Sequence, residues 1–167
     1  MAMVGLFWIT EDSVYVGSPP NAEGHCLRIT SDGLQARCSD GIRAWPWSRL
    51  SSAVVEAAPV EGGTKGAGRF LAAVLEAMVT LGSSYDGEAP PQMFLVLESQ
   101  DGTEEVQVSA ATTGYTSQEI TLSQRLLSRF REGTADPRTL TTWSRDHSGG
   151  TPKPTEREAL LKEWTHE

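Results

Sequence analysis

Three Asp-Gly pairs divide the β-rich parts of this chain at short intervals. Asp32-Gly33 and Asp40-Gly41 lie in the first third, and Asp101-Gly102 lies further along. Asp-Gly between two β-rich segments predicts a hairpin turn, because both central residues of a type I′ turn need a positive φ. The first third of the chain is therefore expected to fold as an antiparallel meander, and a further hairpin is expected around residue 101.

The expected strands follow from these turns and from the alternation of apolar and polar residues. Leu27 and Ile29 fall on one face of a strand, while Arg28 and Thr30 fall on the other. The predicted strands span residues 6–9, 14–17, 26–30, 34–38, 42–47, 52–57, 93–99 and 103–110.

Two helices are expected between and after the strands. Residues 69–81 carry their polar side chains on one narrow stripe, so about two-thirds of the helix circumference is apolar and needs burial. Residues 116–132 place Leu126, Leu127 and Phe130 on one face and end at Gly133, a residue type that favours a helix C-terminus.

Length and charge limit the classes of partner. The 167 residues suit one domain with a short appendage. The net charge of −8 and the pI near 4.9 disfavour attraction to polyanions. We expect no nucleic-acid partner and no stable membrane binding. The amino terminus has no basic targeting region, and the longest apolar segment, 70–81, is too short to cross a bilayer, so we expect a cytoplasmic protein.

The chemical motifs do not support catalysis. Gly62-Gly-Thr-Lys65 lacks the Ser or Thr that follows the Lys of a phosphate-binding loop. Cys26 and Cys38 are expected on opposite faces of the sheet, and three histidines leave little for a His-built metal site. The sequence has no Gly-x-Ser-x-Gly nucleophile elbow. We expect no enzyme activity, no cofactor and no metal site.

Two local features carry open interpretations. Trp45-Pro46-Trp47 places two indoles on one strand face, and the proline restricts this strand to an edge or a bulge. Trp45 and Trp47 form either an aromatic core pair or a binding platform. A cluster of carboxylates at the second hairpin tip lacks the Ca²⁺-loop pattern and is interpreted as a solvated acidic turn; it consists of Glu98, Asp101, Glu104 and Glu105.

The order of these segments resembles bacterial pleckstrin-homology-like (PH-like) domains. The resemblance rests on residues 27–34, on Trp45-Pro-Trp-Ser-Arg-Leu50, and on the hairpin that begins at Phe94-Leu-Val-Leu and precedes an amphipathic helix. It covers about residues 4–132. It implies a mainly β fold, an antiparallel β-barrel of two near-orthogonal sheets capped by that helix. The acidic Glu11-Asp12 turn would repel a phosphorylated headgroup, so lipid binding is not carried over.

The remaining segments are placed around this PH-like domain of residues 1–132. The helix at 69–81 is an insertion into the barrel, residues 133–154 form a linker, and residues 155–167 form an amphipathic C-terminal helix.

The apolar 69–81 helix predicts a partner. Leu71, Leu75 and Val79 form one edge of its apolar surface, which exceeds what one sheet face covers. We expect a homodimer or another protein at this helix; burial under the loop at 82–91 is the alternative.

The C-terminal helix predicts a docking segment. Thr155 and Glu158 match a capping box, and Leu160, Leu161 and Trp164 follow as a short apolar stripe. This stripe packs either on its own domain or on another protein. The function expected overall is a non-catalytic protein–protein interaction module, an adaptor or scaffold with a partner of unknown identity. The alternative is a β-barrel that binds a small apolar ligand.

Overall fold

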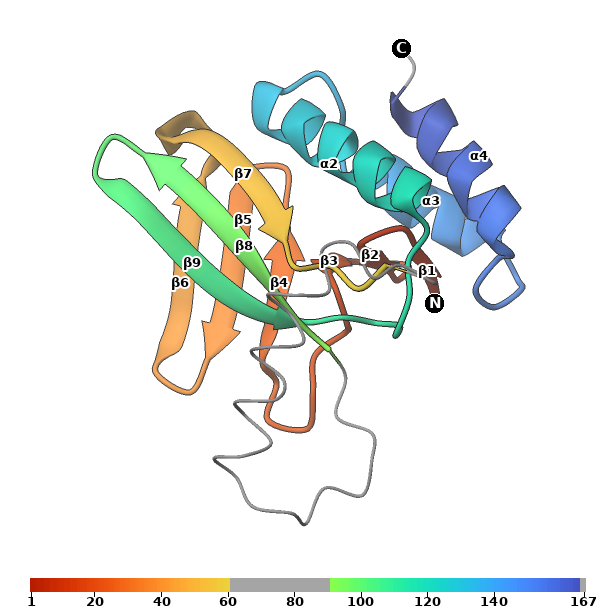
Figure 1. Ribbon diagram of the computed structural model, residues 1–167, viewed down its shortest axis with the longest axis horizontal. Helices are drawn as coiled ribbons and strands as arrows, with labels where there is room; N and C mark the ends of the chain where they lie inside the picture. Colours follow the sequence, from red (N-terminus) through yellow and green to blue (C-terminus); the bar gives the residue numbers. More distant parts are fainter. Residues whose placement is uncertain (61–90, 166–167) are drawn as a thin grey trace.

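Two antiparallel sheets and three α-helices make up the part of the chain that the computed structural model describes, residues 1–60 and 91–165 (Figure 1). The mainly β character with added helices agrees with the sequence prediction. The predicted helix at 69–81, with Leu71, Leu75 and Val79, lies outside the described residues, and so does the homodimer contact expected from it.

Six strands form the first sheet in chain order, and each is antiparallel to the next. In β5, Leu34 and Ala36 are buried while Gln35 and Arg37 are exposed, so alternation sets the core face. The predicted meander is confirmed, with one further short strand at the amino terminus. The strands are β1 (Ala2–Val4), β2 (Phe7–Ile9), β3 (Val14–Val16), β4 (Cys26–Ile29), β5 (Gly33–Cys38) and β6 (Gly41–Pro46).

A 3-10 turn, η1 (Trp47–Arg49), leads from β6 into the second sheet. This sheet has the order β7-β8-β9, and its inward face is formed largely by the buried Met93, Leu95 and Leu97. Its strands are β7 (Leu50–Glu56), β8 (Gln92–Ser99) and β9 (Gly102–Ser109).

The hairpin turns lie one residue earlier than the Asp-Gly pairs suggest. Gly41 pairs with Cys38 and Gly102 pairs with Ser99, so the central turn residues are 39–40 and 100–101. Among the described non-glycine residues only Ala57 has a positive φ, which excludes type I′ turns at these positions. The positive φ is instead adopted by Gly41 and Gly102, at 118° and 125°.

The two sheets do not close into the predicted barrel. Within the described residues, β6 and β9 are edge strands that pair only with β5 and β8, respectively. The physical reason lies between these edges, where side chains of Arg43, Trp45 and Glu104 meet and take the place of a backbone ladder.

Helix α2 (Ser117–Glu132) covers one end of the space between the sheets, as predicted for residues 116–132. It begins with a capping box in which Thr116 and Glu119 bond each other's backbone N–H, and it ends at Gly133 with φ of 76°. Its inward Leu126 and Phe130 are buried in the core.

The segment predicted as a linker contains a helix, and the tail helix, for which two packing alternatives were open, packs on its own chain. Residues 133–154 contain a helix, α3 (Arg138–Asp146), whose Leu140 is buried in the core. Helix α4 (Pro154–Thr165) packs beside α2 and against β1 (Figure 1). Leu161 is fully buried, so the apolar stripe of the tail is used within its own chain.

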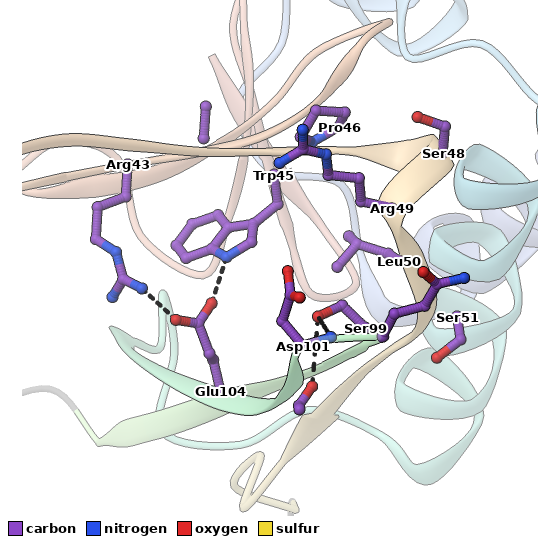
Figure 2. Close-up of a pocket in the computed structure, with 13 residues that line it drawn as sticks. Arg43, Trp45, Pro46, Ser48, Arg49, Leu50, Ser51, Ser99, Asp101 and Glu104 are labelled. Carbon is purple, nitrogen blue, oxygen red and sulfur yellow. Dashed lines mark hydrogen bonds and ion pairs between the residues drawn. The ribbon is translucent and has the colours of Figure 1, made fainter.

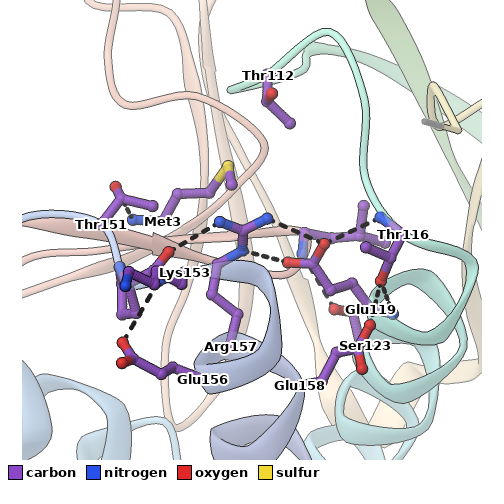
Figure 3. A network of polar contacts seen from close by, with 12 residues as sticks. Met3, Thr112, Thr116, Glu119, Ser123, Thr151, Lys153, Glu156, Arg157 and Glu158 are labelled. Carbon is purple, nitrogen blue, oxygen red and sulfur yellow. Dashed lines mark hydrogen bonds and ion pairs between the residues drawn. The ribbon is translucent and has the colours of Figure 1, made fainter. Parts of the chain in front are cut away.

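A buried ion pair fixes α4 to α2 (Figure 3). Both Glu119 and Arg157 are nearly inaccessible, at 0% and 8% exposure. Arg157 donates to both carboxylate oxygens of Glu119, and its third bond goes to the Pro152 carbonyl at 2.9 Å. The Thr116 hydroxyl donates to Glu158 at 2.7 Å, a second link between the two helices.

None of the described helices is long and apolar enough to cross a membrane.

Candidate functional site

An open cleft lies where the two sheets diverge, between β6 and η1 on one side and the β8–β9 turn on the other (Figure 2). Its volume is about 760 Å³. We call it the Trp45 cleft. Its lining includes charged and apolar side chains: Arg43, Trp45, Arg49, Leu50, Asp101 and Glu104.

Three side chains bridge the cleft from β6 to β9. The Trp45 Nε1–H donates to Glu104 Oε2 at 2.5 Å, and the Arg43 guanidinium forms an ion pair with Oε1 of the same carboxylate. The Arg43 guanidinium carbon also lies 4.9 Å from the centre of the Trp45 ring, a cation–π contact. The register explains this meeting, because Arg43 and Trp45 pair with the buried Ala36 and Leu34 and so face inward.

The hydrogen bond from Trp45 is the main cause that lowers the pKa of Glu104, and Arg43 adds to it. The carboxylate is 46% exposed and the Arg43 side chain is 56% exposed, so solvent screens their attraction. A group with a lowered pKa stabilises the folded state above its ordinary pKa, and this contribution is lost as the pH falls through the lowered value. The bridge is therefore intact at neutral pH and accessible to a competitor.

Trp45→Phe should raise the pKa of Glu104 back toward its ordinary value, because phenylalanine keeps a ring but has no N–H to donate. The measurement is a carbon-13 NMR titration of the Glu104 carboxyl in both proteins. An unchanged midpoint would show that the indole does not hold this carboxylate.

The rest of the Trp45 cleft joins polar side chains to apolar surface. The Asp101 N–H donates to the Ser99 hydroxyl at 3.2 Å, which holds the β8–β9 turn. Arg49 projects from η1, is exposed, and forms no ion pair with any residue in the described ranges. The cleft thus offers an indole face, a guanidinium with no ion pair among the described residues, and a bridged carboxylate.

The predicted site residues do not gather at one place. Trp45 lies in the cleft and is half-buried. Trp47 is buried and does not line the cleft, and its Nε1–H donates to the Thr30 carbonyl at 3.1 Å, so this indole belongs to the core. The predicted site residues of the C-terminal helix lie on α4 and do not line the cleft; they are Leu160, Leu161 and Trp164.

Trp164 has its own aromatic neighbours. It contacts Trp143 of α3 edge-on with ring centres 5.7 Å apart, and Trp143 stacks on His147. Leu160 and Trp164 pack against the core while remaining partly exposed. These contacts assign the α4 stripe to intramolecular packing.

The sequence pattern did not indicate Arg43 as a site residue, and it did not indicate that Glu104 lines the cleft. The sequence pattern places Glu104 in a solvated acidic turn and assigns no role to Arg43. Both residues alternate with outward-facing neighbours and so face inward on their strands, which the sequence could have shown. That β6 comes close to β9 depends on how the two sheets pack.

Metal and thiol chemistry receive no support from the geometry. Across residues 1–60 and 91–165, no three His, Cys, Asp or Glu side chains are grouped closely enough to hold a metal ion. Both cysteines are free, and burial raises the pKa of the Cys26 thiol.

Comparisons with known proteins add no family assignment. Scanning the sequence against protein-family models gave no match, and searches of curated proteins and of solved structures gave no significant match.

Proposed function

We propose that this chain is a non-catalytic protein-interaction module with a PH-like fold, and that the Trp45 cleft is the surface that receives its partner. The observation that carries the proposal is the half-buried Trp45 indole, held at the cleft by Arg43 and Glu104. Tryptophan and arginine are the residue types most often responsible for binding energy at protein interfaces.

The PH-like assignment rests on the order of the elements. A meander, a second three-stranded sheet and a helix over the open end follow one another as in the family that the sequence resembles. Two free thiols are in keeping with a reducing compartment, and we propose a cytoplasmic location on that basis.

The apolar-ligand alternative has less support. The described side chains between the sheets pack against one another as one buried cluster, including Leu34, Leu95 and Leu126. The Trp45 cleft is lined by charged groups and opens to solvent, which suits a protein segment better than a small apolar molecule.

Trp45→Ala should abolish partner capture. The experiment uses the tagged full chain to capture proteins from cells of the source organism, with quantitative mass spectrometry of wild type and variant. Arg138→Ala, an exposed change on α3 outside the cleft, is the matched control and should retain every partner. If no captured protein depends on Trp45, the proposed function is wrong.

A further inference from the structure

The two sheets of the described residues have four edges, and side chains of the same chain cover two of them. At the β1 edge, the Met3 N–H donates to the Thr151 hydroxyl at 3.1 Å. At the β7 edge, Gln124 of α2 accepts from the Val55 N–H at 3.0 Å and donates to the Val55 carbonyl. These contacts occupy backbone groups that would otherwise accept a further strand.

The β6 edge lacks such a cover among the described residues. Successive residues of an antiparallel strand point alternately toward and away from the neighbouring strand. The Trp47 N–H donates to the Asp32 carbonyl at 3.0 Å, which directs the odd-numbered residues toward β5. The N–H and C=O groups of Ile42 and Ala44 therefore point outward, and no residue in 1–60 or 91–165 bonds to them.

Among the described residues, the β9 edge opposite is covered only at its end. The Ser18 N–H donates to the Ser109 carbonyl at 2.8 Å, which shows that odd-numbered residues of β9 face outward. The backbone groups of Thr103, Glu105 and Gln107 have the same orientation and no described partner strand. The two open edges thus lie on either side of the bridge from Trp45 to Glu104.

The side chains of Trp45 and Glu104 span the gap between β6 and β9. These two edges therefore lie further apart than the ~4.8 Å that separates paired strands. A strand added to β6 would place alternate side chains over Trp45 in the cleft and beside Ile42 and Ala44 on the outer face. Ile42 is 66% exposed, more than any other large apolar side chain described except Met1. An added strand would cover it.

Resting on the interaction role proposed above, we propose that the β6 edge binds an extended segment of a partner protein as an additional strand. The segment carries carboxylates on the outer face of the sheet and apolar side chains toward Trp45.

Charge selects the chemistry of this segment. Strands β4, β5 and β6 carry three arginines and no Asp or Glu, although the chain as a whole is acidic. Arg28 and Arg37 are exposed on the outer face, and Arg37 pairs with Ile42 at the edge. Strand β6 of a second copy has no Asp or Glu to offer these arginines, so the complementary partner is a different, acidic segment.

The test is an amide NMR titration of the full chain with a synthetic peptide of alternating Glu and Val. We expect binding at millimolar concentration or below, with shifts and slowed hydrogen exchange at Ile42 and Ala44. The matched peptide of alternating Lys and Val should bind roughly tenfold more weakly. Absence of binding, or equal binding of both peptides, overturns the proposal.

Ala44→Pro separates strand addition from other binding in the cleft. It removes an outward N–H while leaving the β5 ladder intact, and Ala44→Thr is the control that keeps the N–H. We expect only the proline variant to lose the peptide, and a Glu-Val peptide N-methylated at alternate residues should fail against the unaltered protein. Strand addition is wrong and the proposed function stands if Ala44→Pro still binds the Glu-Val peptide, the unaltered protein still binds the N-methylated peptide, and Trp45→Ala binds neither. If Trp45→Ala also binds the peptide normally, the peptide does not occupy the cleft and strand addition beside Trp45 is wrong, whereas the proposed function is decided by the capture experiment. A dimer mass for the free protein that Ala44→Pro abolishes would assign the edge to a second copy.

Discussion

Arg157→Ala lowers the free energy of unfolding by about 3–5 kcal/mol, because it leaves the fully buried Glu119 carboxylate without its cationic partner. The lost guanidinium also releases the Pro152 carbonyl, which connects α4 to the segment before it. For a chain of this size each kcal/mol corresponds to a fall in melting temperature of roughly 2–4 °C. Chemical denaturation followed by circular dichroism measures the loss.

Two variants control this prediction. Arg138→Ala removes an exposed ion pair with Asp136 and should leave the unfolding midpoint unchanged. The double variant Glu119→Gln with Arg157→Met leaves no unpaired buried charge and should recover much of the loss. Equal stability of Arg157→Ala and wild type would mean that α4 is not held to α2 by this pair.

Leu161→Ala lowers the free energy of unfolding by about 2–5 kcal/mol, because Leu161 is fully buried and its removal leaves a cavity. Its side chain lies against Gly5, where a Cβ would approach Leu161 Cδ1 to 2.8 Å. The same denaturation experiment measures the effect.

Leu160→Ala is the matched control one residue away. Leu160 is only partly buried, so its loss should be clearly smaller. A freely docking tail would make both variants as stable as wild type, and that result would restore the docking interpretation of α4.

Much of the fold could be predicted from local sequence. Alternation in β5 and β8, the Asp-Gly pairs, and the apolar face and Gly133 terminus of α2 are signals that each element carries in its own residues. Strand β1 is too short for a periodic pattern, and α3 lies in a polar segment in which only Leu140 is a buried apolar anchor. Tertiary packing stabilises both.

The candidate site was less accessible from sequence for the same reason. The sequence treats Trp45 and Trp47 alike, because both are tryptophans of one short motif. In the structure, Trp47 is a core residue and Trp45 is not. Only the packing of the two sheets separates these indoles and brings Glu104 to Trp45 and Arg43. Burial of Leu161 likewise depends on α4 finding a place beside α2.

In the proposed interaction, the partner binds at the Trp45 cleft and not at the α4 stripe. The most direct measurement compares quantitative partner capture by Trp45→Ala and Trp164→Ala, each confirmed as folded by circular dichroism. We predict that Trp45→Ala loses the partner while Trp164→Ala retains it, because Trp164 packs against Trp143 within the chain. Capture that survives Trp45→Ala and is lost with Trp164→Ala would place the partner on α4 and rule out the cleft.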